Sequence, residues 1–314
     1  MEFKHFSVML NEAIENLSIK ENGIYVDGTV GGGGHSLNIA KHLSKSGKLI
    51  MFDQDIEAIS AAKKRLSSYK DNTIFIHSNY EYMKEKLNEL SIEKVDGILL
   101  DLGVSSYQID NPVRGFSYMN EDEILDMRMD KDNKKTAADI LNQSTEEELY
   151  QIIHDFGEEK FAYRIAQNIV NRRSEKEFKY VKDLNDVIYA SIPYKARKKG
   201  SNPCKKTYQA LRISLNRELE VLNDSLNDMI DMLNNKGRIC VITFHSLEDR
   251  IVKNIFKKNE NPCICPPEFP VCVCKKETKG KVITRKAIVP SEKELSENTR
   301  SRSAKLRVFE KIDL

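Results

Sequence analysis

Four consecutive glycines constrain this chain more than any other feature of its sequence. They occupy residues 31–34, after a short apolar run at 24–26 that ends in Asp27, and a helical pattern of apolar residues follows them. Glycines in series cost stability inside a strand or helix, and they are useful where the backbone takes positive φ or approaches a ligand. The stretch therefore predicts a strand, a tight loop and a helix whose N-terminus faces a ligand, although the loop could also simply turn the chain.

The spacing of these glycines disfavours two common nucleotide motifs. The dinucleotide pattern Gly-x-Gly-x-x-Gly fails because Ser36 or Leu37, depending on the starting residue, takes the third glycine position. The phosphate-loop pattern Gly-x-x-x-x-Gly-Lys-Ser/Thr is absent from the sequence, which disfavours ATP as a phosphoryl donor. Instead, Asp27 and Asp53 each close a predicted strand. Carboxylates at strand ends suit the ammonium and ribose diol of S-adenosylmethionine, with Asp53 in the ribose-binding position of doubly wound folds.

Strand and helix patterns alternate after the glycine loop. Strands are expected at 48–53, 73–77 and 95–100, with helices near 56–66 and 83–90 between them. This alternation predicts an α/β fold with a doubly wound, Rossmann-like parallel sheet and right-handed crossovers. In such sheets the ligand lies beyond the carboxyl ends of the strands, so the residues that end the strands are the candidates for chemistry.

Three more residues are expected at this edge of the sheet. Tyr80 follows the third strand and could cover an adenine ring, or it could simply pack. Asp101 ends the fourth strand before a Gly/Ser loop; because methyl transfer to an amine needs an acceptor for an N–H proton, it is the candidate catalytic residue, with a capping role as the alternative. His245 ends a later strand and is either a substrate contact or a cap or core residue, and Ser246 with Asp249 is the expected cap of the next helix.

Helical patterns replace the alternation in the middle of the chain. A long helix at 208–233 and a strand at 237–244 then indicate that the sheet resumes. The expected parts are a first methyltransferase segment, a helical substrate-recognition insertion and a second methyltransferase segment, at 1–110, 111–206 and 207–314. The insertion ends in a basic run at 195–206, suited either to phosphate contacts or to a solvated linker.

Composition limits the partners and the redox chemistry. The 314 residues include 50 basic and 48 acidic ones, so any nucleic-acid binding must come from local patches. The sequence has neither a long apolar run nor a signal-peptide core, and we expect a soluble, cytoplasmic protein without membrane contact. Its cysteines are then thiols or metal ligands. Two Cys-x-Cys pairs at 263–265 and 272–274 could hold zinc, but the spacing within each pair is tighter than usual and no metal is assigned to the candidate site.

Several ordered blocks of the sequence resemble the bacterial small-subunit ribosomal RNA cytosine-N4 methyltransferases. They are 27–35, 101–106, 125–130, 157–170, 208–212, 244–250 and 301–307. The resemblance implies a Rossmann-like fold with an inserted helical domain, S-adenosylmethionine as the methyl donor, and the N4 amine of a decoding-centre cytosine as the acceptor. The implied partner is small-subunit ribosomal RNA within an assembled or nearly assembled subunit, and the sequence is compatible with a homodimer.

The resemblance also implies cofactor-binding roles for particular residues. They are Gly33, Gly34 and His35 along the methionine part, Asp53 at the ribose, Tyr80 at the adenine, and Asp101 with Gln108 closing the pocket. Two alternatives remain at this stage. One is a DNA or protein amine methyltransferase with the same pocket. The other is a non-catalytic ribosome assembly factor, against which the intact carboxylates at 27, 53 and 101 argue.

Overall fold

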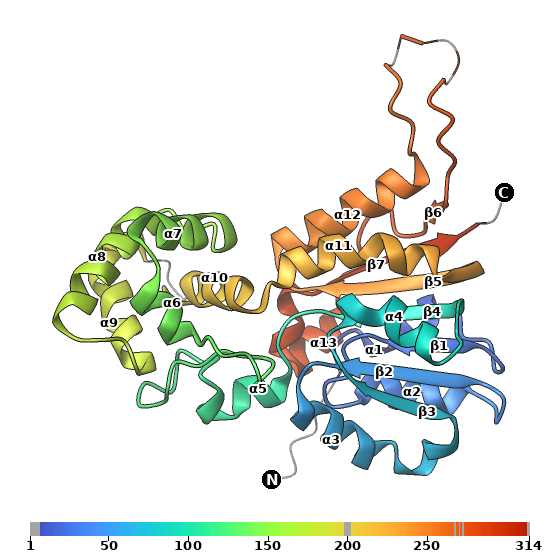
Figure 1. Ribbon diagram of the computed structural model, residues 1–314, viewed down its shortest axis with the longest axis horizontal. Coiled ribbons are helices and arrows are strands. Elements are labelled where there is room, and N and C mark those ends of the chain that lie inside the picture. The colour runs from blue at the N-terminus through green and yellow to red at the C-terminus, as the bar shows by residue number, and fades with distance from the viewer. Residues whose placement is uncertain (1–6, 198–201, 267, 270, 272, 313–314) are drawn as a thin grey trace. The chain divides into compact units, whose positions relative to one another are not determined.

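The computed structural model describes residues 7–312, apart from 198–201, 267, 270 and 272. The chain forms two compact units (Figure 1): a sheet unit of residues 1–103 and 219–314, and a helical unit of residues 104–218. The expected borders of the insertion, 111 and 206, both fall inside the helical unit. No helix among the described residues is both long and apolar enough to cross a membrane.

The sheet unit is built on a seven-stranded sheet in its described part, with the order β3-β2-β1-β4-β5-β7-β6. The strands are β1 Ile24–Asp27, β2 Lys48–Asp53, β3 Thr73–His77, β4 Val95–Asp101, β5 Leu233–Thr243, β6 Gly280–Val282 and β7 Lys305–Lys311. The strands β1 to β5 pair in parallel, and β7 joins β5 and β6 antiparallel. The predicted Rossmann-like parallel sheet is therefore confirmed.

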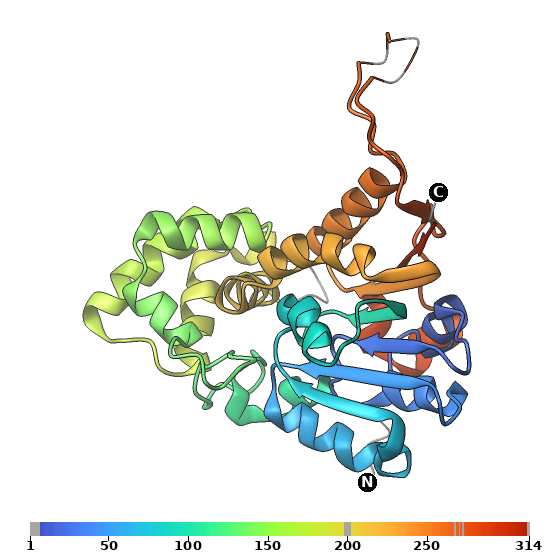
Figure 2. The ribbon, with the colours of Figure 1, turned by 45° about the vertical axis from the view of Figure 1, so that its right-hand side comes forward.

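Helices cover both faces of this sheet (Figure 2), because successive strand residues point to opposite sides. In β2, Leu49 and Met51 join one apolar cluster, which includes side chains of α1, α2 and α3, while Ile50 and Phe52 join another with α4, α11 and α12. The helices of this unit are α1 Leu10–Leu17, α2 Gly34–His42, α3 Ile56–Arg65, α4 Met83–Glu89, α11 Glu218–Asp231, α12 Ser246–Glu260 and α13 Glu292–Glu297, with short 3-10 turns at η1 Ser67–Asn72, η2 Tyr80–Tyr82 and η6 Thr299–Ser303.

The helical unit has an apolar core of its own, to which each of its longer helices contributes. Its helices are α5 Ser106–Asp110, α6 Ala137–Gln143, α7 Glu146–Gln151, α8 Ala162–Glu175, α9 Val181–Ser191 and α10 Lys205–Asn216, with a π-helical turn at η4 Ile152–Phe156 and 3-10 turns at η3 Pro112–Arg114 and η5 Tyr194–Ala196. The predicted helical character of this part of the chain is confirmed.

The expected single helix at 208–233 is wrong. The structure has two helices, α10 and α11, separated by Arg217, whose φ of 53° lies in the left-handed region. The apolar spacing runs through the break, but its two halves are buried in different cores: Leu211 belongs to the core of the helical unit, whereas Leu222 belongs to the sheet unit. The residues beyond α11 extend β5, which begins at Leu233 rather than at residue 237.

The expected cap of α12 is also wrong. His245, not Ser246, is the N-cap residue, and its partner in the capping box is Glu248. Asp249 has another role, because its carboxylate accepts hydrogen bonds from Arg307 Nε at 2.6 Å and Lys305 Nζ at 3.2 Å. These contacts join α12 to β7.

Candidate active site

The candidate site of the sheet unit lies where the strand order changes direction. The chain runs outward from β1 through β2 to β3 and then returns to the other side of β1 as β4. A crevice forms at such a switch point beyond the carboxyl ends of the strands, and it is where open α/β sheets bind ligands. Asp27, Asp53 and Asp101 are the last residues of β1, β2 and β4. The structure thus brings the three predicted carboxylates to one edge of the sheet.

The glycine loop joins β1 to α2 at this edge. Val30 N donates to Phe52 O at 2.9 Å, which fixes the loop against the end of β2. Gly33 is the N-cap of α2 and has a φ of 73°, a conformation that residues with a Cβ rarely adopt. A Cβ at Gly33 would also lie 3.0 Å from Leu66 Cδ1 and 3.3 Å from Ala62 Cα. The loop therefore needs glycine both for its backbone conformation and for its close packing.

Asp27 is buried beneath the loop, with 1% of its surface exposed. Its carboxylate accepts hydrogen bonds from Ser36 Oγ at 2.6 Å and Thr29 N at 3.1 Å. Burial raises the pKa of Asp27 to about 6, and the hydrogen bonds from Ser36 and Thr29 limit the rise. A carboxylate held here would compensate an ammonium group well, because little water competes for it.

Asp53 holds the loop and keeps capacity for a ligand. Its two oxygens accept from Gly31 N at 2.8 Å and Asp55 N at 2.9 Å. A carboxylate has about four acceptor sites, so these two bonds leave room for the hydroxyls of a ribose. Burial raises the pKa of Asp53 to about 6, against the lowering effect of the two backbone hydrogen bonds. The expected ribose contact fits this geometry.

Asp101 and His35 form the chemically most distinctive pair of the site. His35 Nε2 lies 3.0 Å from Val8 O, so this nitrogen carries the proton and donates. In the neutral ring the other nitrogen, Nδ1, is then an acceptor, and it lies 3.6 Å from Asp101 Oδ2. Asp101 N in turn donates to Thr29 Oγ1 at 2.7 Å. This hydrogen bond holds the end of β4 against the segment after β1.

The Asp101 carboxyl group is poised to hold a proton. Its side chain is 26% exposed, yet Oδ1 is buried and has no hydrogen-bond partner among the described residues. Burial, reinforced by the negative charges of Asp27, Glu248 and Glu294, raises the pKa of Asp101 well above its ordinary value. A raised pKa next to a ligand crevice is a common property of general bases. Sequence reasoning missed the acidic neighbours from α12 and α13, because they are remote in the chain and no local signal identifies them.

The other residues predicted for the site make packing and helix-capping contacts in the structure. Tyr80 opens η2, three residues beyond the end of β3, and packs against the core. His245 lies two residues beyond the end of β5, caps α12 and has its Nε2 3.1 Å from Glu248 Oε1. Gln108 belongs to the helical unit, where its amide oxygen accepts from Ser105 N at 3.0 Å in the capping box of α5.

A pocket of about 530 Å³ lies beside the glycine loop in the sheet unit. Gly34 contributes to its wall together with residues of α1 and α13, and Arg65 from the end of α3 adds a positive charge. Its volume is within the range of small-molecule sites. Sequence reasoning missed this pocket, because its walls come from α1, α2 and α13, which are far apart in the chain.

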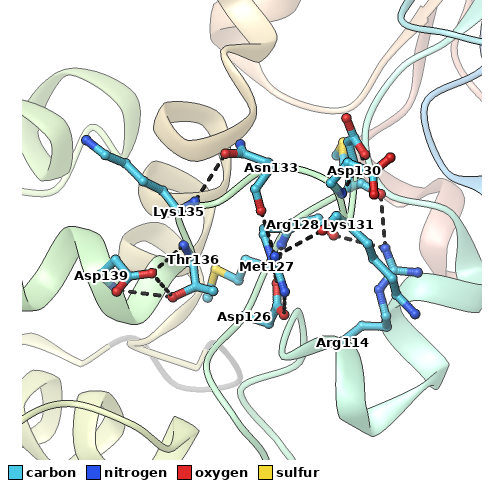
Figure 3. Close-up of polar contacts among 12 residues, drawn as sticks. Arg114, Asp126, Met127, Arg128, Asp130, Lys131, Asn133, Lys135, Thr136 and Asp139 are labelled. Carbon is cyan, nitrogen blue, oxygen red and sulfur yellow. Dashed lines mark hydrogen bonds and ion pairs between the residues drawn. The ribbon is translucent and has the colours of Figure 1, made fainter.

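The block at 125–130 has a structural role within the helical unit (Figure 3). The buried Arg114 donates from Nη2 to Arg128 O at 2.9 Å and to Met129 O at 3.1 Å. Asp126 accepts from Arg128 Nε and Nη2, both at 2.8 Å, in a bidentate pair. Asn216, at the end of α10, bonds to the backbone of the same segment. These contacts fix an irregular loop whose carbonyl groups would otherwise lack partners.

Comparison with known proteins places this architecture in a family. The model of the MraW methylase family matches residues 2–312. The chain belongs to the MraW methylase family. Within the MraW methylase family, the chain is 62% identical to Ribosomal RNA small subunit methyltransferase H 2 of Agathobacter rectalis over 314 residues, covering 100% of both chains. It is 59% identical to Ribosomal RNA small subunit methyltransferase H of Lachnospira eligens, covering 99% of each, and 55% identical to that of Clostridioides difficile, covering 99% and 100%. The family match includes both units.

Proposed function

We propose that this chain transfers a methyl group from S-adenosylmethionine to the exocyclic N4 amine of a cytosine in the decoding centre of small-subunit ribosomal RNA. It is a methylase by family, and its relatives at 55% to 62% identity bear the name of a small-subunit ribosomal RNA methyltransferase. The observation that carries the proposal within the molecule is the Asp101 carboxyl group, with a raised pKa and an unsatisfied oxygen at the switch point of the sheet.

The residues of the sheet unit suit the three polar parts of the cofactor. Asp27 would hold the ammonium group, because its carboxylate is buried and otherwise compensated only by hydrogen bonds. Asp53 would bind the ribose diol with its remaining acceptor sites, and Tyr80 would lie at the adenine. Gly33 and Gly34 would let the loop backbone approach the methionine part without a Cβ in the way.

The bound cofactor supplies an electrophilic methyl group on a sulfonium. Asp101 accepts the proton that the target amine loses as its nitrogen forms a bond to the methyl carbon and the carbon–sulfur bond breaks. A carboxylate with a raised pKa is a stronger base than an ordinary aspartate, which favours this transfer. Val8 O holds the ring proton of His35 on Nε2, so Nδ1, 3.6 Å from Asp101 Oδ2, would face the proton that Asp101 takes up. The protein otherwise contributes placement of the amine in line with the reacting bond.

We further propose that the helical unit recognises the RNA within an assembled or nearly assembled small subunit, in the cytoplasm, and that Gln108 closes the cofactor pocket. Lys205 and Lys206 close the basic run and begin α10, although Lys206 Nζ also donates to Glu158 O at 2.5 Å. Lys195 of the run lies in η5, and Lys198 and Lys199 lie outside the described residues. A homodimer remains compatible with the sequence.

The test is transfer of labelled methyl groups to four substrates: small subunits that lack the modification, naked small-subunit RNA, duplex DNA and bulk protein. We expect label in RNA, with small subunits as the better substrate. Label in DNA or protein would instead support another amine methyltransferase. Absence of transfer by protein that is folded and binds the cofactor would support the assembly-factor alternative.

Variants of one strand test the role of Asp101 in the same assay. Asp101→Asn should reduce single-turnover methylation at saturating cofactor more than it weakens cofactor binding, because the amide keeps the size of the side chain but cannot take the proton. Asp96→Asn is the matched control, since Asp96 lies at the opposite end of β4 and pairs with Lys20 at 2.8 Å. Unchanged turnover in Asp101→Asn would show that Asp101 only binds.

A further inference from the structure

The segment between α12 and β6 carries cysteines that the proposed methyl transfer does not use. It leaves α12 after Glu260 and projects away from the sheet as two adjacent arms in both views (Figures 1 and 2). Because α12 has 15 residues, its end lies roughly 22 Å along the helix from the strand ends at which it begins. The segment therefore calls for an explanation of its own.

The arms bring three thiols of the described residues together. The Sγ atoms of Cys263, Cys265 and Cys274 all lie within 4.8 Å of one another. Cys263 and Cys265 come from one arm and Cys274 from the other, so the cluster joins two stretches that have several residues between them. In an extended chain, residues at i and i+2 point to the same side, which explains how the tight Cys-x-Cys step can present both thiols to one centre.

The distances match a metal site better than a disulfide. Cys263 Sγ and Cys274 Sγ are 3.9 Å apart. Four sulfurs at 2.3 Å from a tetrahedral zinc ion would be separated by about 3.8 Å, whereas bonded sulfurs are separated by about 2.05 Å. In addition, Val273 N donates to Cys265 Sγ at 3.3 Å, a contact that stabilises negative charge on a sulfur ligand.

The arms have little apolar packing to hold them together. Ile264 is 67% exposed, Val271 is 71% exposed and Val273 is 64% exposed. A segment of this length without a core of its own loses much conformational entropy on ordering, and small modules of this kind commonly need a metal or a covalent link. The clustered thiols supply the ligands for one.

We propose that Cys263, Cys265 and Cys274 bind a structural zinc ion that fastens the two arms. The sequence offers a fourth thiol, Cys272, which lies outside the described residues. Thiolate sulfur is the preferred donor for structural zinc, and each thiol loses its proton on binding. The site is separate from the methyl-transfer chemistry, so its test does not depend on activity.

The experiment uses the full chain, purified with a reductant and without chelator. We expect about one zinc per chain by elemental analysis. After zinc removal, added Co²⁺ should produce the sulfur-to-metal charge-transfer bands and intense visible bands of tetrahedral thiolate coordination. Cys265→Ser and Cys274→Ser should each lose most of the metal, while Cys204→Ala, which removes a buried thiol of the helical unit, should retain it.

A second measurement keeps the proposal testable if a variant is unstable. Proteolysis next to Lys275 and Lys276 should be about tenfold faster in the zinc-free wild-type chain than after zinc is restored, because the metal closes the local opening that proteases require. Protein that neither contains zinc nor takes up Zn²⁺ or Co²⁺ would overturn the proposal. A mass two daltons low, from a Cys263–Cys274 disulfide in the reduced preparation, would overturn it as well.

Discussion

Replacing Asp27 by Asn should stabilise the sheet unit at neutral pH and weaken cofactor binding. The folded chain raises the pKa of Asp27 from 3.8 to about 6. A shift of roughly two units corresponds to about 3 kcal/mol at a pH above both values. Since the folded state binds the proton more tightly than the unfolded state, the native state loses this energy as the pH rises from about 4 to about 6.

Asparagine removes the charge and can keep both contacts. Its amide oxygen can accept from Thr29 N, and its NH₂ group can donate to the Ser36 hydroxyl, which turns from donor to acceptor. Allowing about 1 kcal/mol for weaker hydrogen bonds, we expect Asp27→Asn to gain about 1–2 kcal/mol at pH 7.5 and nothing at pH 4. The negative charge of Asp27 also raises the pKa values of Asp53 and Asp101. Its removal should therefore lower both pKa values.

The assay must report the sheet unit alone, because a chain with two units need not unfold in one step. Hydrogen exchange of the amides of β1 and β4 at increasing urea, at pH 4 and pH 7.5, meets this requirement for the protein without cofactor. Calorimetry at pH 7.5 should show weaker binding of S-adenosylmethionine. An equal loss of stability at both pH values would refute the reasoning, since it would mean that the charge carries no penalty in the folded state.

Asp53→Ala should weaken the binding of S-adenosylmethionine roughly ten- to a hundredfold in calorimetry, because a hydrogen bond to a charged acceptor contributes about 1.5–3 kcal/mol; unchanged affinity in folded protein would exclude the ribose contact. Gly33→Ala should lower the free energy of unfolding of the sheet unit by about 1–2 kcal/mol in thermal unfolding, because residue 33 has a φ of 73° and a Cβ there would lie close to Leu66. Arg114→Ala should destabilise the helical unit by about 2–4 kcal/mol, measured by hydrogen exchange in α8, because Arg114 is only 2% exposed and its guanidinium binds two carbonyls; normal protection of α8 would contradict this role.

The parallel strands and the carboxylates at their ends could be predicted from the sequence because their signals are local. Each strand is a short apolar run, and the run 48–53 ends in Asp53 as β2 does. The break at Arg217 could not be predicted, because the apolar spacing continues through it and neither glycine nor proline marks it. Only the division of the chain between two cores explains why the helix ends there.

The chemistry around Asp101 was also only partly predictable. Its place at the end of β4 followed from the strand pattern, whereas its raised pKa depends on Glu248 and Glu294. Likewise, the paired cysteines indicated a metal site, but their tight spacing argued against one until the structure showed that the two arms bring Cys274 to Cys263. In both cases the decisive contacts are long-range, and local sequence patterns do not contain them.

Nucleoside analysis of methylated small subunits tests the central claim most directly. Methylation of an amine needs placement and a proton acceptor, the role that we propose for Asp101, whereas methylation of a cytosine ring carbon needs a nucleophile that activates the ring. Burial raises the pKa of the Cys240 thiol, in β5, to about 12, which leaves it unreactive. We therefore expect labelled methyl groups from S-adenosylmethionine to appear in N4-methylcytidine of small-subunit RNA. Label in a ring-carbon methylcytidine, or in another nucleoside, would contradict the account.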